Sequence, residues 1–230
     1  MTPALKTANL RTRIWRAVEA QHVVSTMRLV NNNREDHGIL EKILEASKPP
    51  VPEEARGKHW LIFTPFRYTP PSPGSRFRAP NDPGVFYAAF EQRTACAEIG
   101  YRRWRFVQDS AGLSLLEAKP MSLFAADVKA VAIDLRKPPL SRRRKAWTSP
   151  DSYVETQALA RKAREQDIEA IVYESVRDPE HGGAVAVLTP KPLNGPIGNP
   201  ESWFLTVTED RVIWQRELGE SFQFIFGGSR

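Results

Sequence analysis

The stretch Pro73–Glu98 reads PGSRFRAPNDPGVFYAAFEQRTACAE and carries most of the information about the fold. Its first part is rich in Gly and Pro and holds two arginines, Arg76 and Arg78, which is typical of a loop. A short apolar run ending near Tyr87 predicts a strand. The Ala-rich residues that follow predict a helix carrying Glu98. We therefore expect a cationic loop, an aromatic side chain and a carboxylate to meet in one cleft.

The rest of the main body has many short strands and few helices. Apolar runs bounded by Pro or Gly and segments of alternating polarity predict strands over residues 59–68, 84–90, 113–118, 128–135, 168–175, 183–188, 203–207, 212–216 and 222–226. Helices are predicted over residues 93–106 and 152–165, and the second is expected to be capped by Ser149 or Asp151. Strands and helices do not alternate regularly, which favours an α+β fold with a mostly antiparallel sheet.

The N-terminal part has a different pattern. Residues 11–46 are predicted to form two helices with a break at Asn31–Asn33, because apolar residues recur there at helical spacing. The stripes of these helices are Trp15, Val18, His22 and Leu29 in the first and Leu40, Ile43 and Leu44 in the second. The proline-rich segment Lys48–Glu54 cannot continue a helix. We therefore predict a helical N-terminal appendage over residues 1–54 and a main domain over residues 55–230.

Composition limits the classes of function. The 230 residues contain 41% hydrophobic and 26% charged residues, which is ordinary for a globular protein. We expect no membrane association, since no apolar run approaches the roughly 20 residues of a spanning helix, and no secretory signal. The single cysteine, Cys96, excludes an intramolecular disulfide and fits a reducing cytoplasm. The four histidines lack partners at metal-ligand spacing, so no metal site is expected.

The net charge of +6 raises the alternative of a nucleic-acid-binding regulator. The sharpest basic run is Arg142–Lys145, which reads RRRK. No basic stripe with interleaved aromatic residues accompanies it, and no DNA-reading motif is present. We therefore expect no direct contact with nucleic acid, although a basic surface also suits an acidic partner or a pyrophosphate ligand.

The arginines and tyrosines of the central stretch suit a nucleotide ligand. Arg67, Arg76 and Arg78 are candidates for binding phosphate, because a guanidinium is always charged and binds phosphate through two hydrogen bonds. The alternative for each arginine is exposure to water or pairing with a carboxylate. Tyr68 and Tyr87 could lie flat against a planar ring of a ligand, and the alternative for each is packing in the core.

Three further residues are candidates for chemistry on such a ligand. Glu98 has small or apolar helical neighbours and could stabilise the positive charge that develops in a glycosyl transfer; alternatively it pairs with Arg102 one turn away. His59 could bind a ribose hydroxyl or be a strand-edge residue. Ser175 could position a phosphate or a catalytic group, or simply end a strand. Together these residues are the parts needed to hold a dinucleotide and break its glycosidic bond.

Four motifs in this order resemble the RES-domain family, which comprises toxins of bacterial toxin–antitoxin pairs. They read GSRFRAPNDPGVFY, TACAE, AADVKAVAIDL and IVYESVR, and the resemblance runs from about His59 to Leu188. That family is similar in fold to ADP-ribosyltransferases of the diphtheria-toxin type. The resemblance therefore implies a split sheet, with NAD bound as substrate between its two halves.

The resemblance also implies roles for single residues. Arg76 corresponds to the family arginine, Tyr87 to the platform for nicotinamide, Glu98 to the catalytic carboxylate and Ser175 to the family serine. The family loop usually reads Arg-Trp/Phe-Asn, whereas this chain has Arg-Phe-Arg, which leaves open whether Arg76 or Arg78 binds the pyrophosphate.

Two further positions correspond less closely. Arg67–Tyr68 resembles a second Arg-aromatic pair of the family, so both residues are expected to contact NAD. His59 resembles the ribose-holding histidine of the His-Tyr-Glu transferases.

The activity implied is cleavage of NAD at the bond between nicotinamide and ribose. We favour transfer of ADP-ribose to a protein target, because the predicted N-terminal helices offer a docking surface. The alternative is a glycohydrolase or phosphorylase that depletes NAD. The implied partner is an antitoxin that resembles a helix-turn-helix repressor, and the implied location is the cytoplasm.

Overall fold

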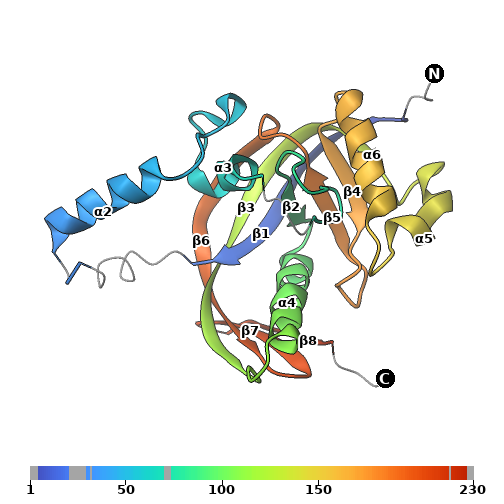
Figure 1. Cartoon of the computed structure of the whole chain (residues 1–230). Helices are drawn as coiled ribbons and strands as arrows, with labels where there is room; N and C mark the ends of the chain where they lie inside the picture. Colours follow the sequence, from blue (N-terminus) through green and yellow to red (C-terminus); the bar gives the residue numbers. More distant parts are fainter. Residues whose placement is uncertain (1–4, 21–29, 32, 70–73, 218, 227–230) are drawn as a thin grey trace.

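One eight-stranded sheet organises the chain (Figure 1). The computed structural model describes residues 5–20, 30–31, 33–69, 74–217 and 219–226. The strands are β1 (Ala8–Glu19), β2 (Phe86–Ala89), β3 (Leu116–Asp134), β4 (Ala170–Glu174), β5 (Gly183–Val187), β6 (Leu193–Val207), β7 (Arg211–Arg216) and β8 (Ser221–Ile225). The helices are α2 (Arg34–Ala46), α3 (Trp60–Arg67), α4 (Gln92–Asp109), α5 (Arg144–Trp147) and α6 (Val154–Glu165), with 3₁₀ turns η1 (Glu53–Ala55) and η2 (Leu140–Arg143).

The sheet runs in the order β1-β2-β5-β4-β3-β6-β7-β8, and β1 also pairs with β3. Strand β3 is the centre of this arrangement, since it pairs with β1, with β6 and, near its end, with β4. The β3–β4 pairing is parallel and the other pairings are antiparallel. The predicted α+β fold with a mostly antiparallel sheet is confirmed. The strands predicted over residues 113–118 and 128–135 proved to be the two ends of β3.

The helix predicted from residue 11 is wrong, because that segment forms strand β1. Its residues pair in continuous antiparallel register with β3, from Ala8 opposite Ala132 to Glu19 opposite Met121. Both faces of β1 are buried in places: Ile14 packs into one apolar cluster and Ala17 into another. Buried residues three positions apart imitate the spacing of a helix, which explains the error. His22 and Leu29 of the expected stripe lie outside the described residues.

The segment 59–68 also differs from the prediction, because it forms helix α3 rather than a strand. His59 caps this helix, since its Nδ1 atom accepts a hydrogen bond of 3.2 Å from the backbone nitrogen of Leu61. A short apolar run does not distinguish a buried strand from a short helix. The chain before β2 presses closely on α3: a Cβ atom at Gly84 would lie 1.9 Å from the carbonyl oxygen of Pro65. Glycine is therefore required there.

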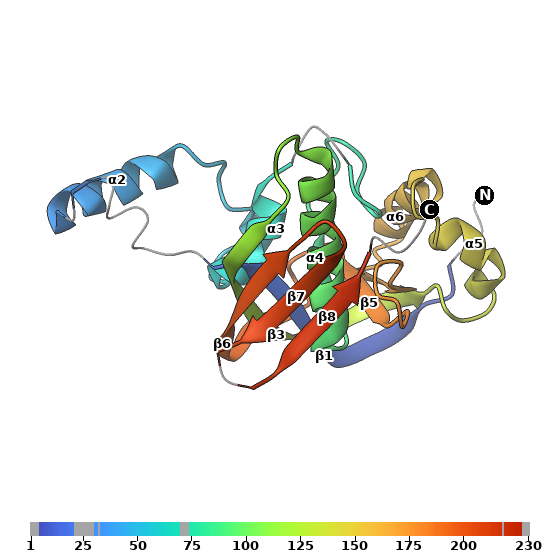
Figure 2. The same cartoon turned by 90° about the horizontal axis from the view of Figure 1, so that it is seen from below.

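Helices α4 and α6 cover different parts of the sheet (Figures 1 and 2). Helix α4 packs on β3 and β6–β8 in a cluster that includes Trp203 and Trp214. Helix α6 packs over β4 and β5. The prediction of α6 is confirmed, but its expected cap is wrong. The cap residue is Tyr153, without a side-chain cap, and Ser149 instead accepts a hydrogen bond from the backbone of Ser152 in the preceding turn.

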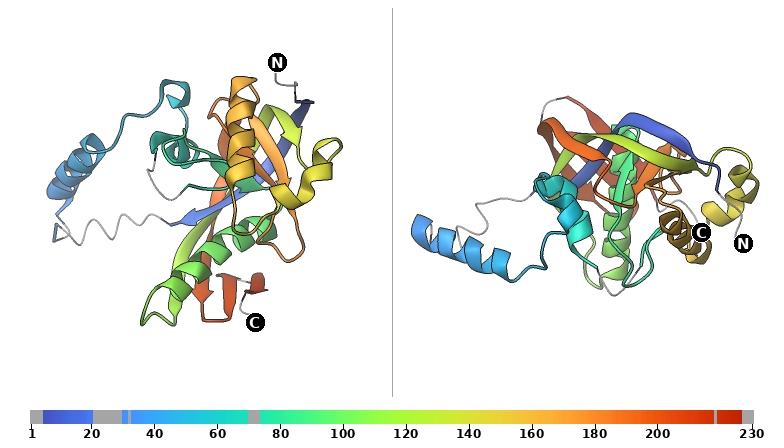
Figure 3. Two further views of the ribbon diagram at one scale, coloured as in Figure 1. Left: turned by 45° about the vertical axis from the view of Figure 1, so that its right-hand side comes forward. Right: turned by 90° about the horizontal axis from the view of Figure 1, so that it is seen from above.

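Helix α2 projects away from the sheet in every view (Figure 3). It has no buried residue, and its side chains Ile39 and Ile43 are 56% and 60% exposed. Since β1 belongs to the sheet, only the part of the expected appendage around α2 lies outside it. The second of the two predicted N-terminal helices is thus confirmed and the first is not.

Candidate active site

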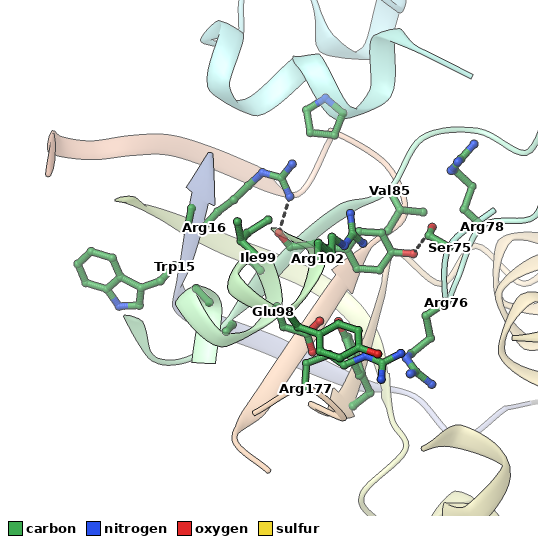
Figure 4. A pocket seen from close by; sticks show the side chains of 18 of the residues that line it. Trp15, Arg16, Ser75, Arg76, Arg78, Val85, Glu98, Ile99, Arg102 and Arg177 are labelled. Carbon is green, nitrogen blue, oxygen red and sulfur yellow. Dashed lines mark hydrogen bonds between the residues drawn. The ribbon is translucent and has the colours of Figure 1, made fainter. Parts of the chain in front are cut away.

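A pocket of about 630 Å³ lies beside the point where β1 and β2 meet. These strands share a single residue pair, Trp15 opposite Ala89, and α4, α3 and the loop 74–78 complete the wall. Five of the residues expected at the site line this pocket: Tyr68, Arg76, Arg78, Tyr87 and Glu98. The structure thus brings the arginine loop, the strand tyrosine and the helix carboxylate to one cavity (Figure 4).

Ser175 does not line the pocket, but it fixes the carboxylate that does. It is fully buried just after β4, and its Oγ atom donates a hydrogen bond of 2.6 Å to Oε1 of Glu98. Among the described residues no ion pair joins Glu98 to Arg102, which was the alternative prediction for this glutamate. Glu98 is therefore oriented in the pocket by a neutral hydrogen-bond donor.

Tyr87 connects the strand to the arginine loop. Its hydroxyl lies 2.7 Å from Oγ of Ser75 and accepts a hydrogen bond of 2.9 Å from the backbone nitrogen of Phe77. Burial raises the pKa of Tyr87, so its phenol is protonated at neutral pH. These bonds place Arg76, between Ser75 and Phe77 in the chain, at the pocket wall.

Arg76 and Arg78 have similar burial, 9% and 8% exposed, but different directions (Figure 4). Nη1 of Arg76 donates to the carbonyl oxygens of Trp147 and Ser149, at 2.9 and 3.0 Å, and its guanidinium lies over the ring of Tyr153. Arg76 is therefore oriented by carbonyl groups, and no carboxylate of the described residues pairs with it.

Arg16 on β1 is a pocket residue that the sequence analysis missed. Its Nη1 donates a hydrogen bond of 2.6 Å to the carbonyl oxygen of Tyr87, and its guanidinium lies 4.8 Å from the ring centre of Phe86. Within the part of the chain that the structure describes, its buried Nε has no hydrogen-bond partner. Burial, and then the nearby charge of Arg102, lower the pKa of Arg16 to about 10. It is still a cation at neutral pH, with a donor unused.

A signal for Arg16 exists in the sequence once residues 8–19 are read as a strand. Side chains two residues apart share a face, so Arg16 falls on the face of Ile14, which is buried. Arg11 and Arg13 fall on the opposite face and are exposed.

Two more arginines line the pocket, Arg102 and Arg177, and the sequence did not predict them there. The guanidinium of Arg102 lies 5.8 Å from the ring centre of Tyr87, and that of Arg177 lies 3.9 Å from the ring centre of Tyr101. Nη2 of Arg177 also donates to the carbonyl oxygen of Pro150 at 2.6 Å. The lining thus combines five arginines with one carboxylate, an arrangement suited to an anionic ligand.

Two predicted ligands lie elsewhere. Arg67 is tied to α2: its Nη1 lies 2.7 Å from Oε1 of Glu45, and its Nε donates to the carbonyl oxygen of Pro49. His59 is the cap of α3 and packs beside Trp60. Neither side chain lines the pocket, so the pocket gives no support to the expectation that they contact the ligand. Their positions followed from the incorrect strand predicted there.

Two other features concern the described residues as a whole. None of their helices combines the length and apolar character needed to cross a bilayer. Their His, Cys, Asp and Glu side chains also form no group of three or more that could hold a metal ion.

The fold is of the α+β class, and the described part of the chain lines its pocket with five arginines and one carboxylate. Residues 51–206 match the family model described as the RES domain. The chain therefore belongs to the RES domain family. No curated protein sequence matches it.

A solved structure with a similar course of the chain is the crystal structure of the M. tuberculosis MbcT–MbcA toxin–antitoxin complex. The matched chain is 10% identical, with a TM-score of 0.47, over 95% of this chain and 87% of that one. The family assignment does not depend on this likeness.

Proposed function

We propose that this protein is a toxin that cleaves NAD at the bond between nicotinamide and ribose and transfers ADP-ribose to a protein target. The observation that carries the proposal is the convergence of Arg76, Arg78, Tyr87 and Glu98 on one pocket. Membership of the RES domain family supports the same conclusion.

The pocket fits a dinucleotide in size and charge. Its volume of about 630 Å³ is within the range of about 300–1,000 Å³ typical of small-molecule sites. The pyrophosphate of NAD is an anion, and guanidinium groups bind it through charge-assisted hydrogen bonds. Arg16 supplies an orphaned Nε donor for this purpose, and Arg78 and Arg102 supply further positive charge.

Glu98 suits the bond cleavage. The glycosidic bond breaks with its electron pair passing to the nicotinamide nitrogen, so that neutral nicotinamide leaves and positive charge develops on the ribose. A carboxylate held close to that charge stabilises it. Ser175 holds Glu98 through a hydrogen bond of 2.6 Å, which reduces the reorganisation needed during the reaction. The acceptor nucleophile then forms the new bond to the ribose carbon and loses its proton to solvent or base.

The choice of a protein acceptor rests on α2. A helix that exposes Ile39 and Ile43 offers a surface for recognising a protein, which hydrolysis of NAD does not require. The RRRK segment favours nucleic acid less than its sequence suggested, because Arg143 pairs with Glu155 and Arg144 with Glu174.

As a toxin, the protein would act in the cytoplasm and need an antitoxin that resembles a helix-turn-helix repressor. Occlusion of the pocket is a direct way to neutralise it. Expression of this chain alone should then arrest growth, and co-expression of the gene beside it should restore growth.

The test is incubation of purified protein with cell lysate and NAD labelled in its adenylate part. Release of nicotinamide with label on a protein supports the transferase. Release with label in free or phosphorylated ADP-ribose supports the alternative of a glycohydrolase or phosphorylase. Absence of nicotinamide release contradicts the proposal.

A further inference from the structure

A buried polar cluster joins the loop after β4 to the first turn of α4, outside the pocket lining. Its centre is Asp178, which is 2% exposed. Oδ1 of Asp178 accepts a hydrogen bond of 2.5 Å from Nη1 of Arg93, and Oδ2 accepts one of 2.8 Å from Oγ1 of Thr94. A buried carboxylate is costly unless it is paired in this way, so this cluster fixes the loop on the helix.

The same residue controls the direction of the Ser175 hydroxyl. The backbone nitrogen of Asp178 donates to Oγ of Ser175 at 3.0 Å, and that of Arg177 donates at 3.3 Å. A hydroxyl has one proton and two acceptor lone pairs. Since two backbone groups use the lone pairs, the proton is left to donate, and Oε1 of Glu98 lies 2.6 Å away.

The loop and the helix are therefore held together at two points on one helix face. Thr94 and Glu98 are four residues apart on α4 and lie one above the other. Asp178 holds the first of them and Ser175 holds the second. The loop packs closely on the helix, since a Cβ atom at Gly182 would lie 2.1 Å from Oγ1 of Thr94 and 2.8 Å from Oδ2 of Asp178.

We propose that Asp178 is a positioning residue for Glu98, which acts by anchoring the loop from which Ser175 donates its hydrogen bond. The proposal rests on the NAD-cleaving function argued above. Loss of the anchor lets the loop move, the Ser175 hydroxyl turns to other partners, and Glu98 loses its fixed orientation. Turnover falls, while the pocket arginines outside this loop, Arg16, Arg76 and Arg102, stay in place.

The experiment measures nicotinamide release and NAD affinity in Asp178→Asn and in the matched pair Thr94→Val and Thr94→Ser. We expect kcat to fall by about tenfold or more in Asp178→Asn and Thr94→Val, with KM and the Kd for NAD changed less than about twofold. Thr94→Ser keeps the hydroxyl and should retain activity. Asp210→Asn is the control, because Asp210 also accepts hydrogen bonds from a threonine and an arginine, Thr208 and Arg211, but lies in the turn between β6 and β7 and does not line the pocket.

A double-mutant cycle separates positioning from general loss of stability. In a Ser175→Ala background, Asp178→Asn should lower kcat no further, since Asp178 acts through Ser175. Independent, multiplying effects of the two substitutions would overturn the proposal, as would an equal fall in Asp210→Asn. If Asp178→Asn does not fold, the comparison of Thr94→Val with Thr94→Ser tests the proposal in its place.

A structural measurement is independent of turnover. Crystals of wild-type protein and of Thr94→Val should differ in the distance from Ser175 Oγ to Glu98 Oε1, which should exceed hydrogen-bonding range in the variant. An unchanged distance overturns the positioning role even in a protein that cleaves NAD. Failure of the wild type to release nicotinamide, with the distance lengthened, would contradict only the NAD function.

Discussion

The arginines of the pocket and the arginines elsewhere in the fold have different kinds of partner. In the pocket, Arg16, Arg76 and Arg177 donate to backbone carbonyl oxygens, and these three and Arg102 lie over aromatic rings. Several arginines elsewhere pair with carboxylates, as in Arg67–Glu45, Arg93–Asp178, Arg136–Asp134, Arg144–Glu174 and Arg161–Asp82. Arg93 and Arg136 lie over aromatic rings as well, and Arg164 donates to the carbonyl oxygen of Pro83.

This difference separates two uses of the same side chain. A carbonyl oxygen or a ring orients a guanidinium and leaves its positive charge uncompensated, whereas a carboxylate neutralises it. Paired arginines tie elements together, as Arg67 ties α3 to α2. Pocket arginines create a positive potential in a partly desolvated cavity, where it attracts an anion most strongly. Glu98 is the one carboxylate that the described part of the chain places in that cavity.

The largest effect is expected from removing this single negative charge. Glu98→Gln keeps the size of the side chain but cannot stabilise the positive charge on the ribose, so kcat for nicotinamide release should fall by about 100-fold or more. The Kd for NAD, measured by calorimetry, should rise little or even fall, because the pocket becomes more positive. Glu165→Gln, on the exposed side of α6, serves as the control. Unchanged nicotinamide release in Glu98→Gln would contradict the assignment.

The next prediction compares one arginine of each kind. Arg16→Met keeps the apolar volume and removes a cation with an unused donor, so the Kd for NAD should rise by about tenfold to a hundredfold. Arg67→Met should leave the Kd unchanged and instead release α2, which limited proteolysis near Pro49 would detect as faster cleavage. Equal effects of both variants on NAD affinity would contradict the distinction between the pocket arginines and the arginines that pair with carboxylates.

Tyr87→Phe tests the link between the strand and the arginine loop, with a smaller expected effect. It leaves the backbone nitrogen of Phe77 and the hydroxyl of Ser75 without their partner. The free energy of unfolding in urea should fall by about 1–2 kcal/mol, and KM for NAD should rise about threefold as the loop loosens. Tyr68→Phe, at a side chain that is 37% exposed, should not change the stability. A fully stable Tyr87→Phe would show that the loop is held by other contacts.

Local sequence predicted the elements from Arg76 to Glu98 better than it predicted the N-terminal part of the sheet. The segment from Arg76 to Glu98 is continuous in the chain, and its loop, strand and helix form as their local patterns indicate. Ser175 was predicted to end a strand, because the apolar run before it clearly indicates that strand. The prediction failed at β1, because this strand depends on partners more than 100 residues away: Ala8 pairs with Ala132. No local pattern contains that pairing, and tertiary contacts override local spacing.

The failure at α3 has a different cause. The run HWLIFTPFRY is too short and too apolar to show a period. The outcome is decided by the His59 cap and by packing of Leu61, Ile62 and Phe66 into the apolar cluster under the sheet. Once the helix forms, Arg67 points to Glu45 instead of the pocket. His59 and Arg67, both expected to contact NAD, therefore lie at the two ends of a helix and do not line the pocket.

The smallest effect is expected at a paired arginine on the surface. Arg143 lies 2.8 Å from Glu155, but the two side chains are 57% and 53% exposed, and such ion pairs contribute little. Arg143→Gln should lower the free energy of unfolding by less than about 0.5 kcal/mol, leave the Kd for NAD unchanged, and not alter the salt dependence of any binding to duplex or RNA. If it abolished a steeply salt-dependent nucleic-acid affinity, the RRRK segment would be a binding site. Such a site would adjoin the pocket, because Arg143 lies over the ring of Trp147, whose carbonyl oxygen accepts a hydrogen bond from Arg76.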